Sequence, residues 1–270
     1  AANAMQGEDE TKFLRFDPEG VRLLADGSLV ISDEYGPWID EFSPAGVRKR
    51  RFATPQKFRT PHPSADAAQE SPPVSLSGRQ PNRGLEGLAI APDHKHVYAM
   101  LQSPLIQDGA LNEKGKRIGV NIRMLELNLE TRTTRELVYV LENASNGANE
   151  IEAVSDHEFL VLERDGKDGN KAQFRRVYRV DIAGATDVSD IATLPTTTLP
   201  ETIKPVRKTM FLDFMDDAYG LRGPAMPEKI EGLALGPKLQ DGRRVLVATV
   251  DNDFNPNVPN IAWVFSVKLD

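Results

Sequence analysis

Short apolar segments separated by polar turns run along most of this chain. Segments of five to eight residues either alternate apolar and polar positions or are continuously apolar, and turn sequences such as ADGS, PDHK and LQDGR stand between them. This pattern is typical of antiparallel β-structure. No segment keeps the apolar period of about 3.6 residues that would predict a long helix, and only DFMDDAYGL (213–221) favours a short helical turn. We therefore expect an all-β protein.

The predicted strands recur in similar groups. Each group opens with an acid at the start of a strand, continues with a short apolar strand and a turn, and returns in a second strand that ends in polar residues. The acids, which lie 66 to 79 residues apart, are Glu19, Glu86, Glu152 and Glu231. Third strands are expected at 38–43, 121–128, 174–181 and 261–269, and fourth strands at 47–52, 133–142 and, from a weaker pattern, 188–194. Four-stranded antiparallel units in series indicate the blades of a β-propeller.

The chain, 1–270, is interpreted as one β-propeller domain with four recognisable blades. The predicted blades span 17–53, 84–142, 149–194 and 229–269, and long insertions occupy 54–82, 103–119, 165–173 and 195–228. Connections of this length are uncommon in a compact domain unless they are functional or disordered. The last unit ends after its third strand, and four blades make a small ring. We expect these blades to belong to a larger propeller of about six.

Propeller topology brings the four acids to one place. The first strand of a blade lines the central channel and the second returns beside it, so the start of the first and the end of the second share one mouth. The second strands are followed by a polar set, namely Asp33, Glu34, Gln102, Glu163, Arg164, Asp165, Asp251, Asn252 and Asp253. The expected bases are few: Arg83, Arg164 and Lys229. The sequence therefore predicts a strongly acidic mouth.

Crowded carboxylates raise one another's pKa, and a hard divalent cation with oxygen ligands relieves that repulsion. We expect Ca²⁺, with Mg²⁺ or Mn²⁺ as alternatives, at a metal site formed by Glu19, Glu86, Glu152, Glu231, Asp251 and Asp253. A structural role stays open for each acid, which would then accept backbone N–H groups or pair with Arg164 or Lys229 of a neighbouring blade.

Composition excludes several classes of function and of site. The net charge of −7 argues against nucleic acid as a partner, and the lack of cysteine excludes disulfides, thiolate zinc sites and cysteine nucleophiles. No apolar run is long enough for a membrane-spanning helix, and the first residues show no signal-peptide pattern. His94 and His96 lack a nearby third ligand for zinc, and no serine stands in a G-x-S-x-G context.

Several segments, in order along nearly the whole chain, resemble the phytase-like family, described by the esterase-like activity of phytase. They are DPEGVRLLADGSLVISDEYGPWIDEFSPAG, NRGLEGLAIAPD, FLVLERDG and KIEGLALGPKLQDGRRVLVATVDNDF. The resemblance implies a β-propeller, hydrolysis of phosphate esters, and a periplasmic or secreted location. The first unit is also similar to the openings of gluconolactonase-type propellers, which hold a divalent metal in the channel.

The first functional hypothesis is a calcium-dependent hydrolase of phosphate esters that acts, as a monomer, on a small molecule. Besides the metal ligands, we expect a catalytic set of Asp33, Glu34, Glu163, Arg164 and Asp165, and substrate contacts from Arg83, Lys229 and Asn252. Two alternatives stay open. One is a metal-dependent lactonase or carboxylic-ester hydrolase that uses the same acids, and the other is a non-catalytic extracytoplasmic propeller that binds a ligand or a protein.

Overall fold

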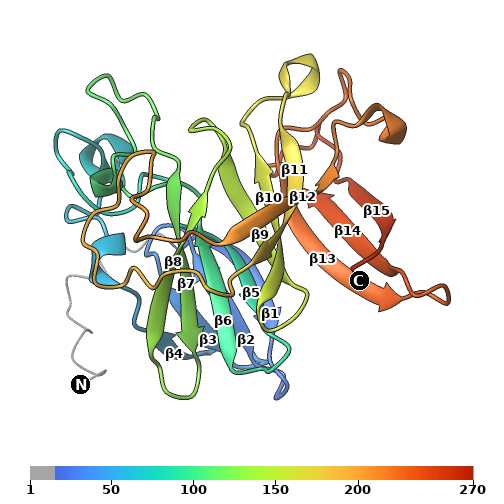
Figure 1. The fold of residues 1–270 in the computed structure, drawn as a ribbon, viewed down its shortest axis with the longest axis horizontal. Helices are drawn as coiled ribbons and strands as arrows, with labels where there is room; N and C mark the ends of the chain where they lie inside the picture. Colours follow the sequence, from blue (N-terminus) through green and yellow to red (C-terminus); the bar gives the residue numbers. More distant parts are fainter. Residues whose placement is uncertain (1–15, 270) are drawn as a thin grey trace.

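The computed structural model describes residues 16–269, and these form fifteen strands and five short 3-10 turns (Figure 1). The strands make four antiparallel sheets, each in chain order. The first two sheets contain β1 (Pro18–Leu23), β2 (Leu29–Asp33), β3 (Ile39–Phe42) and β4 (Arg48–Phe52), then β5 (Leu85–Ile90), β6 (His96–Leu101), β7 (Asn121–Asn128) and β8 (Thr134–Val140). The last two contain β9 (Gly147–Ala153), β10 (Glu158–Arg164), β11 (Arg175–Asp181) and β12 (Arg207–Asp213), then β13 (Ile230–Lys238), β14 (Arg244–Val250) and β15 (Ala262–Val267).

The sheets are arranged as the blades of a β-propeller, as the repeats predicted. The first strand of each sheet is innermost, and β1 packs on β5, β5 on β9 and β9 on β13. Figure 1 shows the third sheet between the first two sheets on one side and β13–β15 on the other. The expected helical turn in 213–221 is present as a 3-10 turn at Asp217–Tyr219.

One predicted strand is wrong. Residues 188–194 form no strand, and the fourth strand of the third sheet is β12, which lies inside the predicted insertion 195–228 and pairs with β11. The apolar residues of 188–194 are instead buried against β8, where Val188 and Leu194 pack with Val138, and the backbone N–H of Val188 donates to the carbonyl of Glu136. The segment is apolar because it covers a neighbouring sheet and not because it extends its own.

Apolar layers between successive sheets form the core. Strand alternation sends Phe159 and Val161 of β10 into the layer shared with the second sheet, and Leu160 and Leu162 into the layer shared with the fourth. Both faces of the middle sheets are thus buried. This burial on both faces explains why β10, with the sequence EFLVLER, has four consecutive apolar residues instead of alternating apolar and polar positions.

Glycine after the repeated acid allows the innermost strands to approach closely. A Cβ on Gly87 would lie 2.8 Å from the backbone nitrogen of Ile151 on β9, closer than real Cβ atoms come to any neighbour. The Glu86-Gly87 pair therefore records a backbone contact between neighbouring sheets as well as an acid.

A polar network joins the four innermost strands. Arg22 of β1 donates from Nη2 to the carbonyl of Ile151 at 2.9 Å, and the same nitrogen lies 3.2 Å from Glu150 and 3.3 Å from Glu152. Glu150 also accepts from the backbone N–H of Leu88 on β5 at 3.1 Å. Glu152 accepts from that of Leu235 on β13 at 3.1 Å.

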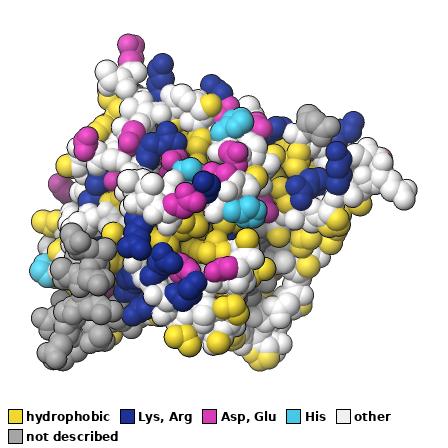
Figure 2. All heavy atoms as spheres, turned by 90° about the horizontal axis from the view of Figure 1, so that it is seen from below, with side chains coloured by type: hydrophobic (Ala, Val, Ile, Leu, Met, Phe, Trp, Pro, Cys, Tyr) yellow, Lys and Arg dark blue, Asp and Glu magenta, His cyan; other side chains and the backbone are white. Residues whose placement is uncertain are grey.

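Basic residues gather on the side of the molecule seen in Figure 2, from below the view of Figure 1, next to acidic side chains and apolar patches. Among the described strands, β4 contains the consecutive basic run Arg48–Arg51. Acids of β3 neutralise this run, since Lys49 lies 2.5 Å from Glu41 and Arg51 lies 2.8 Å from Asp40. The run therefore serves pairing between neighbouring strands.

We predict that Arg22→Leu lowers the free energy of unfolding by about 2–3 kcal/mol, because two largely buried carboxylates lose their cation. Chemical denaturation measures the change. The control is Arg207→Leu on β12, whose exposed side chain pairs with Asp181 at the surface and should matter little. Equal effects of the two substitutions would contradict a central role for the network.

Candidate functional site

Each innermost strand carries an acid or an amide in an irregularity of its hydrogen-bond pattern. The register shifts between Pro18 and Val21 in β1, between Leu85 and Gly87 in β5, and between Ile230 and Gly232 in β13. In β9 it shifts between Ala148 and Glu150. The residues at these four bulges are Glu19, Glu86, Asn149 and Glu231. Bulges re-aim side chains and are frequent beside functional sites.

The expected position of Glu152 is therefore corrected. It was predicted at the start of its strand, but β9 begins at Gly147, and Asn149 occupies the position equivalent to Glu86. Glu152 lies three residues further along, where Arg22 and the backbone of Leu235 engage its carboxylate. Alignment on the glycine that stands two residues before Glu86 and Asn149 would have found the equivalence.

The last residue of the second strand, or the residue that follows it, lies beside the bulge in each sheet. The backbone N–H groups of Glu34, Gln102 and Asp251 donate to the carbonyls of Asp17, Gly84 and Lys229, at 2.9 to 3.0 Å. In the third sheet, Arg164 pairs with Gly147 in the same way. The two sets of side chains meet at one end of the innermost strands, which we call the acidic mouth.

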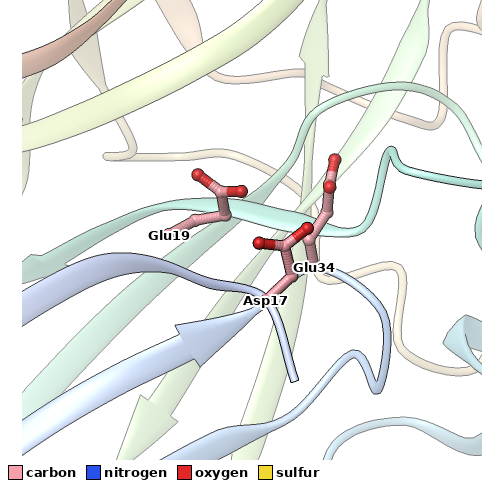
Figure 3. Close-up of side chains that lie close together, drawn as sticks. All are labelled: Asp17, Glu19 and Glu34. Carbon is pink, nitrogen blue, oxygen red and sulfur yellow. The ribbon is translucent and has the colours of Figure 1, made fainter. Parts of the chain in front are cut away.

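Three carboxylates from the first sheet come together in this mouth. Asp17, Glu19 and Glu34 each place an oxygen within 4.8 Å of the others. Figure 3 shows Asp17 and Glu34 side by side, with Glu19 reaching toward the same space. Asp17 was not predicted, because it precedes β1 and ends no second strand. Only its position across from Glu34 brings it into the group.

Glu86 of the second sheet joins this group. Its Oε1 accepts from Gln102 Nε2 at 2.6 Å and from Asn149 Nδ2 at 3.0 Å. Its carboxyl group is also within hydrogen-bonding reach of Glu34. Two amides thus orient Glu86 and leave Oε2 directed away from them.

Burial and mutual repulsion disfavour charge on these acids. Partial desolvation raises the pKa of Glu19 to about 9, although the residue keeps an exposed surface, and the negative charges of Glu86 and Asp17 assist. Burial also raises the pKa of Glu34, with Glu86 and Glu19 adding to the effect. The pKa of Glu86 is raised by burial and by Glu231, while the hydrogen bond from Gln102 opposes the shift. At neutral pH this group therefore requires bound protons or a cation.

Three buried oxygens at the acidic mouth accept no hydrogen bond when Glu34 and Glu86 are both ionised. They are Glu34 Oε1, Glu86 Oε2 and Asn149 Oδ1, and their residues are 1%, 4% and 4% exposed. Unsatisfied buried polar atoms are rare in folded proteins and need an explanation. Carboxylate and amide oxygens are the ligands that Ca²⁺ prefers. The chemistry of these donors, together with the carboxylates of Asp17 and Glu19, therefore fits a cation that prefers oxygen ligands.

Two acids that were predicted to be catalytic, Asp33 and Asp165, accept hydrogen bonds from the backbone of the loops beside them. Asp33 accepts from the backbone N–H groups of Asp17, Tyr35 and Gly36, each at 3.1 Å. Asp165 accepts from three backbone N–H groups of the following loop, the nearest being that of Gln173 at 2.9 Å, and pairs with Arg175. Their oxygens shape the turns beside the mouth.

Glu163 is also enclosed. It is fully buried and accepts from Tyr139 Oη at 2.9 Å and Asn146 Nδ2 at 2.8 Å. Lys208 of β12 lies 3.1 Å away and neutralises its charge. The structure uses Glu163 to join β8 and β12 to β10.

Unlike the unpaired acids that the first two sheets place at the mouth, the mouth acids of the fourth sheet have basic partners. Arg164 pairs with Glu231, and Lys229 lies 2.5 Å from Asp253 and 3.6 Å from Asp251. Among the described residues, no ion pair reaches Asp17, Glu19, Glu34 or Glu86. The predicted ring therefore divides into a paired half and an unpaired half.

The two remaining residues predicted to contact the substrate differ in their position: one lies in the half of the mouth with paired acids and the other beside the unpaired acids. Asn252 folds the loop after β14, since its Nδ2 donates to the carbonyls of Asn255 and Val258. Arg83 stands before β5 and donates from Nη1 to Ser103 Oγ at 3.1 Å, and its charge acts on Glu86 and Glu34. Of these residues, Arg83 is the one beside the unpaired acids.

We predict that the metal-free protein loses thermal stability as pH rises. Carboxyl groups whose pKa is raised on folding stabilise most below their unfolded value of 4.5, and this stabilisation is lost as pH approaches about 9, the pKa of Glu19. With a chelator present, we expect the melting temperature to fall by at least about 4 °C between roughly pH 5 and pH 9.

Glu34→Gln should weaken this pH dependence, because one of the buried titrating groups is gone. Asp241→Asn, in the exposed turn between β13 and β14, is the control and should leave the slope over this range unchanged. A melting temperature that is constant or rises with pH in the wild-type chain would contradict the prediction.

Comparison with known proteins places these features in a family. An uncharacterized secreted protein of Arthroderma benhamiae is 32% identical over 209 residues, which cover 66% of this chain and 40% of that protein. Among solved structures, a protein from Lactobacillus plantarum matches with a TM-score of 0.41 and 13% identity, over 94% of this chain and 52% of its own. The calcium structure of a Trichoderma reesei carbohydrate-active enzyme of family AA12 has a TM-score of 0.37 and 14% identity, over 94% and 53%.

The chain thus spans about two fifths of the curated relative and about half of each of these structures. Within the described residues, no helix has the length and apolar character needed to cross a bilayer. The family model for phytase-like proteins, described as esterase-like activity of phytase, matches residues 1–254. Because this match covers most of the chain, the protein belongs to the phytase-like family.

Proposed function

We propose that this protein is a calcium-dependent hydrolase of phosphate esters whose site is the acidic mouth. The observation that carries the proposal is the set of three buried oxygens without partners, from Glu34, Glu86 and Asn149, beside the carboxylates of Asp17 and Glu19. Family membership supports phosphate-ester chemistry, since the family is described by the esterase-like activity of phytase.

The proposed ligands are Asp17, Glu19, Glu34, Glu86 and Asn149. A bound calcium ion would supply charge neutralisation, a polarised phosphoryl oxygen and an oriented water. The protein supplies the orientation of its own groups, because Gln102 and Asn149 hold one oxygen of Glu86 and leave the other without an N–H donor. The bulges in β1 and β5 turn Glu19 and Glu86 toward the same end of the strands.

The proposed roles differ from the sequence expectation in a definite way. Glu34 moves from the catalytic rim to the metal ligands, and Asp17 and Asn149 are added. Glu152, Glu231, Asp251 and Asp253 leave the metal set because each already has a basic partner. Asp33, Glu163 and Asp165 leave the catalytic set because hydrogen bonds and ion pairs occupy their oxygens.

A secreted or periplasmic location completes the proposal. The Arthroderma benhamiae relative is described as secreted. Calcium sites in extracellular modules typically bind at about 10⁻⁴–10⁻³ M, so an incomplete ligand sphere would suffice there. The proposed substrate is a small phosphate ester, and the acidic net charge of −7 disfavours nucleic acid.

The test is phosphate release from phytate and from nitrophenyl phosphate, with calcium and with a chelator. We expect activity only with calcium, and we expect Glu19→Gln and Asn149→Ala each to lower both calcium affinity and activity by at least about tenfold. Calcium affinity is measured by isothermal titration calorimetry.

The matched control is Asp253→Asn, which removes an exposed acid of the same mouth that pairs with Lys229. It should change neither calcium affinity nor activity by more than about threefold. Hydrolysis of lactones without phosphate release would favour the lactonase alternative. Absence of calcium binding would favour a non-catalytic propeller.

A further inference from the structure

Three arginines from different parts of the chain lie within electrostatic reach of one another beside the acidic mouth. Arg83 precedes β5, Arg164 ends β10, and Arg117 belongs to the insertion 103–119 between β6 and β7. Their charges act on one another, because burial and the neighbouring charges of Arg117 and Arg164 lower the pKa of Arg83 to about 10. Arg83 also contacts the start of the insertion through Ser103.

Two of these guanidinium groups keep buried donors without acceptors. Arg164 is 8% exposed, and its Nε has no hydrogen-bond partner, although Nη1 donates to the carbonyl of Asp165 and Nη2 pairs with Glu231. Arg117 Nη1 is likewise buried and without a partner. A buried cationic N–H without an acceptor is costly, so these donors are available to an anionic ligand.

The loop that carries Arg117 is held firmly. Leu111 and Arg117 pair across a short hairpin, and the backbone N–H of Ile118 donates to the carbonyl of Ala110 at 2.9 Å. Below the hairpin, buried Asp108 lies 2.8 Å from Arg123 and accepts from the backbone N–H of Leu194 at 2.7 Å. Arg117 is therefore presented by an anchored loop, which reduces the entropy lost when a ligand binds.

The charges favour a doubly charged oxyanion. Among the described residues, no ion pair involves Arg117 or Arg83, and the single ionic partner of Arg164 is Glu231. Arginine donors suit the oxygens of phosphate, which accept several N–H groups at once. Because Arg83 also adjoins the carboxylates of Glu34 and Glu86, calcium bound at those carboxylates would offset their repulsion of the phosphate.

We propose that Arg83, Arg117 and Arg164 bind the phosphate group of a phosphomonoester, and that Arg117 makes the insertion 103–119 part of the substrate site. This proposal rests on the proposed function and deepens it, since it assigns the substrate anion to three arginines that adjoin the proposed calcium ligands. Sequence reasoning had placed Arg83 and Arg164 in the mouth, but it had no reason to select Arg117 among the basic residues of a polar insertion.

The test measures binding of inorganic phosphate to the whole chain by isothermal titration calorimetry, with calcium and with a chelator. We expect Arg117→Gln to weaken phosphate binding by at least about tenfold, the effect of losing one charge-assisted contact. Arg117→Lys should retain part of the affinity. Lys116→Gln is the matched control, because it removes the same charge from an exposed position of the same hairpin. Calcium affinity should be the same in all four proteins.

Steady-state kinetics provide a second test of the proposed phosphate site. Arg117→Gln should raise KM for nitrophenyl phosphate more than it lowers kcat, with the melting temperature unchanged. Phosphate binding that depends on Arg117 in a protein without phosphatase activity would support this site while contradicting the hydrolase. Equal phosphate affinity of Arg117→Gln and the wild-type chain would overturn the site, and so would acetate binding as tightly as phosphate.

Discussion

The close approach of the four innermost strands is the constraint on which the other features depend. Gly87 lets β5 lie against the backbone of β9, and Arg22 reaches from β1 to the carbonyl of Ile151 on β9. Strands this close bring their bulged residues to one small region. Repulsion between carboxylates, and the means of relieving it, therefore decide the chemistry of that region.

The repulsion between carboxylates is relieved differently in the two halves of the acidic mouth. Arg164 and Lys229 neutralise the acids of the fourth sheet, whereas Asp17, Glu19, Glu34 and Glu86 have no ionic partner within the described chain. Burial alone cannot stabilise a group of charged carboxylates. Retained buried oxygens without partners, on both acids and an amide, are the feature on which the proposed ligand site rests.

For several candidate residues, residue type and position at a strand end did not suffice to identify the members of the site. Asp33, Glu163 and Asp165 have the residue type and location of catalytic acids, yet backbone N–H groups and basic side chains occupy their oxygens. Asn149 was not predicted because it has no charge, although it occupies the bulge of β9. The missing information was which hydrogen bonds each side chain already makes, and these come from loops and sheets that strand patterns do not describe.

The amino-acid sequence by itself determined the repeated strands, their antiparallel grouping and the end of the sheets at which polar residues collect. These properties follow from local alternation and turn chemistry, which act over a few residues. Tertiary structure alone decided which acids are paired, because the partners are remote: Arg164 and Glu231 are 67 residues apart, and Arg22 and Glu152 are 130 apart. It also decided that β12 rather than 188–194 completes the third sheet, since the apolar surface of β8 buries the earlier segment.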